Sequence, residues 1–174
     1  MQKRIVLLTM IALAVVSLLT SCRGLSAEQK NAANDALKPL QKLKAAAEIG
    51  VNKMQYGSLV IDAQSAVNQA LPKLPDGDLR KEIKSAMEAY ADANALWGEN
   101  KTDTILFVGR PLPTGDEFKD KIIGAMFSET ATTMQERYKI PVHEDKYIQK
   151  DEGLSIIWKA AKEHVDRASK LLEQ

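Results

Sequence analysis

The segment DEGLSIIWKAAKEHVDRASKLLE, residues 151–173, decides the fold class because it carries the cleanest hydrophobic pattern in the chain. Its apolar residues recur every three or four positions, the spacing that places side chains on one face of an α-helix. These residues are Leu154, Ile157, Trp158, Ala161, Val165, Ala168 and Leu172. The segment therefore predicts a helix that buries one face against other helices.

Two further helices are expected upstream of this segment. The turn residues Pro72, Pro75 and Asp76-Gly77 precede a helix from Asp78 to about Gly98. Its apolar face comprises Leu79, Ile83, Met87, Tyr90, Asn94 and Trp97. Thr114 or Asp116 caps the next predicted helix, which Ile140-Pro141 ends. Its stripe comprises Phe118, Ile122, Met126, Thr130, Met134 and Tyr138.

The connection between these two helices, residues 99–115, is longer than most helix–helix loops. Thr104 to Val108 reads as a short extended apolar piece, and its side chains are expected to fold back onto the bundle. If they stay exposed, they form a docking patch for another protein. That patch would comprise Ile105, Leu106, Phe107, Val108 and Arg110.

The N-terminal half of the domain leaves two interpretations open. Ser26 and Gln29 fit a capping box, so a helix is expected from Ala27 onward. Apolar stripes over 33–54 and 59–71 point in directions about 160° apart on a helical wheel. Either the helix breaks between Gly50 and Gly57, or one helix buries opposite faces in its two halves. Because turn signals are weak there, we favour one continuous helix from 27 to 71, roughly 67 Å long.

Composition agrees with an all-α fold. Only nine residues are Phe, Trp or Tyr, and the single cysteine excludes intrachain disulfides. The prediction is therefore a single helical domain over 27–174, with one long N-terminal helix and three further helices. A partly extended loop separates the second helix from the third.

The first 22 residues have the organisation of a secretory signal. Lys3 and Arg4 precede the largely apolar run from Ile5 to Leu19, which is shorter than the roughly 20 residues of a membrane-spanning helix. The ending Leu19-Thr20-Ser21-Cys22 resembles the lipobox of the bacterial lipoprotein class. An uncleaved anchor and an ordinary signal, with Cys22 incidental, are the alternatives.

The lipoprotein resemblance implies how the chain is processed and where it resides. Residues 1–21 would be removed, Cys22 acylated, and 22–26 left as a short tether to a membrane of the cell envelope. Arg23 after the cysteine, in place of Asp, resembles the pattern sent to the outer membrane, facing the periplasm, in bacteria with two membranes. Acylation would also remove the only thiol from an oxidising compartment.

Charge and motifs exclude several functions. Without residues 1–21 the chain has 22 basic and 23 acidic residues, a net charge of −1, and no basic stripe for nucleic acid. No catalytic motif or phosphate loop occurs, so an enzyme and a cofactor are not expected. His143, Glu144, Asp145 and His164 are the residues considered for a metal-binding module, but their spacing matches no known ligand set. No metal site is predicted.

Three functional hypotheses follow. The first is a lipid-anchored envelope protein that binds or scaffolds a partner, either another envelope protein or a second copy, without chemistry of its own. The second is a small-ligand binding or sensing bundle in which Tyr90, Trp97 and Trp158 line an interhelical pocket. The metal-binding module is the third.

Overall fold

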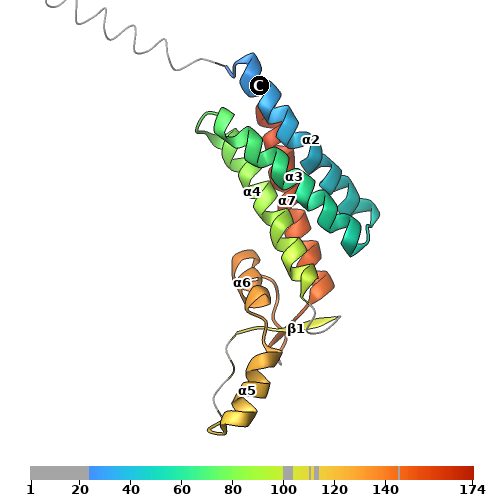
Figure 1. Ribbon diagram of the computed structural model, residues 1–174, viewed down its shortest axis with the longest axis vertical. Helices are drawn as coiled ribbons and strands as arrows, with labels where there is room; N and C mark the ends of the chain where they lie inside the picture. Colours follow the sequence, from blue (N-terminus) through green and yellow to red (C-terminus); the bar gives the residue numbers. More distant parts are fainter. Residues whose placement is uncertain (1–23, 100–103, 110, 112–113, 145) are drawn as a thin grey trace, which may run out of the picture.

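The computed structural model describes residues 24–99, 104–109, 111, 114–144 and 146–174 and shows a mostly helical protein with one small β-ribbon (Figure 1). The elements are α2 (Ala27–Ile49), α3 (Lys53–Ala70), a 3-10 turn (Leu71–Lys73), α4 (Asp78–Gly98), β1 (Ile105–Phe107), α5 (Glu117–Met126), α6 (Glu129–Tyr138), β2 (Tyr147–Gln149) and α7 (Lys150–Leu172). The all-α prediction is confirmed in this broad sense.

Four helices form the body of the molecule. α2 and α3 pack as a hairpin, and α4 and α7 form the most extensive helix pair, with α7 also contacting α2. The start of α2 and the C-terminus lie at one end of this body, and β1, α5 and α6 lie at the other (Figure 1). Within the described residues no helix has the length and apolarity to span a bilayer.

The predicted continuous helix over 27–71 is wrong, because the chain reverses direction at residues 50–52. Gly50 ends α2 with a φ of 86°, a conformation that residues with a side chain rarely adopt. Asn52 then caps α3 by accepting a hydrogen bond from the backbone N–H of Gln55. The two apolar stripes differ in direction because they belong to two helices that face each other.

Substituting Gly50 by Ala is expected to lower the free energy of unfolding by about 1–2 kcal/mol, because a Cβ strains the left-handed conformation. Gly124→Ala is the control, because Gly124 lies inside α5 with no atom near its added Cβ. Urea denaturation of both variants measures the difference. Equal effects of the two substitutions would show that the Gly50 conformation contributes nothing specific.

The single helix predicted to end before Pro141 is also divided, at Phe127 and Ser128. Phe127 forms a parallel bridge with Phe107, and the Ser128 N–H donates to the Phe107 carbonyl at 2.9 Å. β1 itself pairs antiparallel with β2, opposing Leu106 to Ile148. These contacts hold together the two ends of the segment that carries α5.

The core is built mainly from small aliphatic side chains. Its buried residues include Ala33, Ala36, Leu40 and Leu43 of α2 and a matching set on α3, α4 and α7. Gly153 lies where α7 approaches α4 closely, and a Cβ there would lie 3.0 Å from Cδ2 of Leu96 and 3.3 Å from Cδ1 of Ile140, so these side chains would have to shift. Close helix packing therefore stabilises a chain whose single cysteine allows no intrachain disulfide.

Candidate functional site

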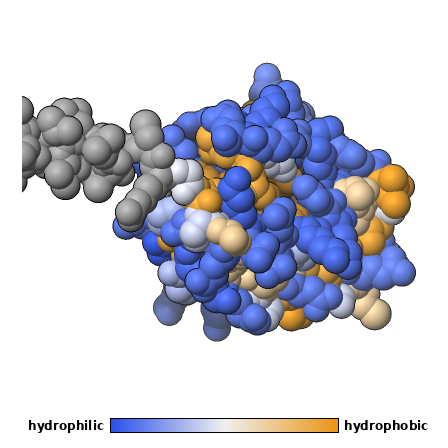
Figure 2. Space-filling view, turned by 90° about the horizontal axis from the view of Figure 1, so that it is seen from above, coloured by the Kyte–Doolittle hydropathy of each residue, from blue (hydrophilic) through white to orange (hydrophobic). Residues whose placement is uncertain are grey.

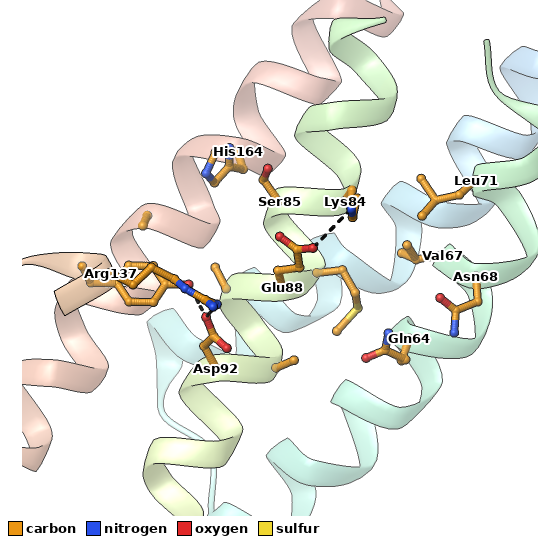
Figure 3. Close-up of a pocket in the computed structure, with 15 residues that line it drawn as sticks. Gln64, Val67, Asn68, Leu71, Lys84, Ser85, Glu88, Asp92, Arg137 and His164 are labelled. Atoms are coloured by element: carbon orange, nitrogen blue, oxygen red, sulfur yellow. Dashed lines mark hydrogen bonds and ion pairs between the residues drawn. The ribbon is translucent and has the colours of Figure 1, made fainter. Parts of the chain in front are cut away.

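An open groove of about 670 Å³ runs along α4 (Figure 3). We call it the α4 groove. α3 and the 3-10 turn border it on one side, and α6 and α7 border it on the other. Its lining comprises Gln64, Val67, Asn68, Leu71, Lys84, Ser85, Met87, Glu88, Ala89, Ala91, Asp92, Arg137, Tyr138, Ala160 and His164.

Asp92 joins α4 to α6 at one edge of this groove. Its Oδ2 accepts hydrogen bonds from Nη1 of Arg137 at 2.5 Å and from the Tyr138 hydroxyl at 2.7 Å. Burial, together with the bond to Asp92, raises the pKa of Tyr138, so the phenol stays protonated and donates. A charge-assisted pair of this kind fixes the position of α6 beside the groove.

Glu82 joins α4 to α7 at the other edge. Its Oε2 lies 2.6 Å from Nδ1 of His164 and 2.9 Å from Nε of Arg167. Partial burial alone would raise the pKa of Glu82, but the hydrogen bonds from His164 and Arg167 outweigh it and lower the pKa. The carboxylate is therefore stabilised in its charged form.

The lowered pKa of Glu82 predicts a pH-dependent contribution to stability. A carboxyl whose pKa falls on folding stabilises the protein above its unfolded pKa, here near 4.5, and loses that contribution as pH falls through the folded pKa. Glu82→Gln should lower the free energy of unfolding by about 1 kcal/mol at pH 7. The difference from the unmodified chain should shrink as the pH falls below about 4.5 and through the lowered pKa of Glu82. Calorimetry across this range measures it, and a pH-independent difference would contradict the assignment.

The charged groups that line the groove are paired within the protein. Lys84 lies 3.6 Å from Glu88 along α4, Asp92 holds Arg137, and His164 contacts Glu82. The groove thus combines neutralised charges with amide and aliphatic side chains. Arg137 and Tyr138 are of residue types enriched at protein interfaces, whereas Lys84, Glu88 and Asp92 are of types depleted there.

Of the aromatic residues predicted from sequence, Tyr90 lies in the core, and Trp97 and Trp158 are half-buried against it; none of the three lines the α4 groove. Trp97 and Trp158 pack edge to face at 5.4 Å, and each contacts Tyr56, at 5.5 and 5.7 Å. The Tyr56 hydroxyl accepts from Nε1 of Trp158 and donates to the carbonyl of the buried Tyr90. This packing gives the predicted ligand pocket no support.

Sequence reasoning missed Tyr56 and the residues of the α4 groove. Tyr56 begins the buried stripe that continues through Val60, Ala63 and Val67, and it stands one turn beyond the cap at Asn52. If the sequence analysis had placed a turn at Gly50, a new helix would have been expected after it, and Tyr56 would have been recognised as the start of its buried stripe. The groove residues carry no comparable signal because they are polar or small and scattered over four helices.

The predicted docking patch folds back onto the body, as the sequence argument expected. Leu106 and Val108 are buried, whereas Ile105 and Phe107 are half-buried. Arg110 lies outside the described residues, and so does Cys22. The buried side chains of β1 thus serve the core and are not a free surface.

The residues considered for metal binding have separate partners. The His143 ring stacks on Tyr147 at 4.7 Å, whereas His164 contacts Glu82. Glu144 is exposed, and Asp145 lies outside the described residues. In the part of the chain that the structure describes, no group of three or more His, Cys, Asp and Glu side chains is placed to share a metal ion.

Comparisons with known proteins returned no matching family model, no matching curated protein and no matching solved structure.

Proposed function

We propose that this chain is a lipid-anchored protein of the bacterial cell envelope that binds a segment of another envelope protein in the α4 groove. The groove carries this proposal, because it is open and lined by paired charges beside Tyr138. A polypeptide segment could be held there by shape and by hydrogen bonds to Arg137, Tyr138 and the amide side chains. The proposal assigns no chemical step to the protein.

The lipobox supports the anchored part of the proposal. Four residues separate Cys22 from Ala27, the first residue of α2, so an acylated Cys22 would hold this end of the body close to the headgroups. β1, α5 and α6 lie at the opposite end (Figure 1). The outer membrane, facing the periplasm, is the proposed location in bacteria with two membranes.

Acylation is tested by growing cells that express the full chain with an alkyne fatty acid. The unmodified chain should take up the label and sediment with membranes, because one or more acyl chains contribute about 0.8 kcal/mol for each buried CH₂. Cys22→Ala should abolish labelling and release the protein from the membrane pellet. Ser21→Ala, which keeps a small residue before the cysteine, is the matched control. Unchanged labelling of Cys22→Ala would disprove the anchor.

Binding in the groove is tested with a photoreactive amino acid at Gln64, which lines the groove, and at Gln69, an exposed glutamine of the same helix. Illumination of whole cells should yield an adduct of one discrete mass from position 64 and none from position 69. Equal adducts at both positions, or none at position 64, would contradict the proposal.

A further inference from the structure

One ring nitrogen at the edge of the α4 groove faces two partners that it cannot satisfy together. Nδ1 of His164 lies 2.6 Å from Oε2 of Glu82 and 2.8 Å from Nη2 of Arg167. A ring nitrogen either carries a proton and donates, or lacks one and accepts, whereas an ionised carboxylate only accepts and a guanidinium only donates. In each protonation state of Nδ1, therefore, one contact is a hydrogen bond and the other is repulsive.

The proton on Nδ1 selects between two arrangements of the same three side chains. When Nδ1 is protonated, it donates to Glu82, and Nη2 of Arg167 turns away. When Nδ1 is unprotonated, it accepts from Arg167, and Oε2 of Glu82 moves off. Arg167 suits both arrangements, because its Nε donates to Glu82 at 2.9 Å and its Nη1 lies 3.8 Å from Oε2 of Glu163.

The three side chains lie toward the end of the body that holds the start of α2 and the C-terminus. Glu82 is near the start of α4 and Arg167 is near the end of α7, and both helix ends lie there (Figure 1). Viewed from this end, the molecular surface is mostly hydrophilic (Figure 2). The side chains of His164 and Glu82 are only 28% and 21% exposed, so water screens their contact in part. Charge at this position therefore acts on the groove beside it.

The charges that line the groove cancel when His164 is neutral. The lining residues of α3 are uncharged, and the charged ones of α4 and α6 form two ion pairs, Lys84 with Glu88 and Asp92 with Arg137 (Figure 3). Tyr138 is neutral because burial raises its pKa. Protonation of His164 thus gives the lining one net positive charge.

The ion pairs between α7 and α2 lie on another side of α7. Asp166 binds Lys44, and Lys162 binds Glu48. Asp166 and Lys162 are each two residues from His164, which places them about 160° away around the helix. Their charges therefore compensate each other away from the groove.

We propose that Glu82, His164 and Arg167 form a proton-operated switch of the α4 groove, and that the groove prefers an acidic polypeptide segment when His164 is protonated. The net positive charge of the protonated lining attracts a carboxylate of the segment. Because imidazole groups change charge between about pH 5 and 8, the segment binds more tightly at the acidic end of this range. The preference for an acidic segment rests on the proposed function, whereas the exchange of partners at Nδ1 does not.

The exchange is tested by NMR on the full chain, purified in detergent and labelled with 15N in histidine. The chain has two histidines, and the His143→Gln variant assigns the signals of His164. Long-range 1H–15N spectra should show both ring nitrogens of His164 protonated at pH 5, and the proton on Nε2 alone at pH 8. A proton retained on Nδ1 at pH 8 would overturn the switch.

Removal of the guanidinium tests the role of Arg167 in the same spectra. In Arg167→Gln, Nδ1 should keep its proton at pH 8, because Glu82 is then its only charged partner. Lys170→Gln, which removes an exposed cation of the same helix, is the matched control and should behave as the unmodified chain does. An unprotonated Nδ1 in Arg167→Gln at pH 8 would show that Arg167 does not compete for it and would overturn the switch.

The effect on binding is tested with the photoreactive amino acid at Gln64, in permeabilised cells equilibrated at pH 5 or pH 8. The adduct from position 64 should be about threefold more abundant at pH 5, the effect of one favourable charge pair. His164→Gln should remove this difference, and His143→Gln should keep it. Adducts of equal yield at the two pH values would overturn the preference for an acidic segment. The absence of any adduct at both would contradict the proposed function, and the preference with it.

Discussion

Tyr56→Ala is expected to lower the free energy of unfolding by about 3–5 kcal/mol, the range for removing a large buried ring. Tyr56 is fully buried, and its ring contacts both Trp97 and Trp158. Its loss opens a cavity where α3, α4 and α7 meet. Because the two tryptophans are the only ones in the chain, their fluorescence reports the change directly.

The hydroxyl of Tyr56 makes a separable contribution. Burial raises the pKa of Tyr56, so the phenol stays neutral; it accepts from Trp158 and donates to the Tyr90 carbonyl. Tyr56→Phe should cost about 1–2 kcal/mol, because Nε1 of Trp158 loses its acceptor and the carbonyl loses a donor.

Urea denaturation monitored by tryptophan fluorescence measures both Tyr56 variants. Tyr147→Phe is the matched control, because Tyr147 is only half-buried in β2, and a change within about 0.5 kcal/mol is expected for it. If Tyr56→Ala costs no more than Tyr56→Phe, the ring does not carry the stability assigned to it.

The sequence was sufficient to predict the helices whose partners lie along their whole length. In α7 the seven stripe residues are buried or half-buried, with Ile157, Ala161 and Ala168 completely so. A helix that packs on its neighbours from end to end must keep one apolar face, so its period is readable from the sequence.

Helix boundaries were harder to predict where a break depends on a distant contact. α5 and α6 share a four-residue period that is apolar except at Thr130, yet Phe127 pairs with Phe107, twenty residues upstream, and the helix is interrupted there. The break at Gly50 had local signals, a glycine followed by the cap residue Asn52, but neither forms a standard turn dipeptide.

The exposed surfaces were the least predictable from sequence. Met54 belongs to the stripe predicted to be buried, but it is 86% exposed because the reversal at Gly50 turns it outward. Asp92 meets Arg137 across 45 positions of sequence. Such pairings depend on the tertiary arrangement, which helical periodicity does not determine.

Ser128→Ala is expected to lower the free energy of unfolding by about 2–3 kcal/mol, because one buried hydroxyl makes two hydrogen bonds. Its Oγ accepts from the N–H of Ala131, which caps α6, and donates to Oε2 of Glu99 at the end of α4. The cap alone contributes about 1 kcal/mol, and a hydrogen bond to a charged carboxylate adds about 1.5 kcal/mol or more.

Asn52→Ala is the comparison that measures the contribution of a helix cap alone. Asn52 caps α3 at an exposed position, and its side chain accepts a hydrogen bond from the backbone N–H of Gln55. Urea denaturation should show Ser128→Ala to be the more costly substitution by about 1 kcal/mol or more. A double-mutant cycle with Glu99→Ala should recover a coupling of similar size. Equal costs for the two caps would mean that the bond between Ser128 and Glu99 adds nothing. The support of α5 would then rest on Phe107 and Phe127 alone.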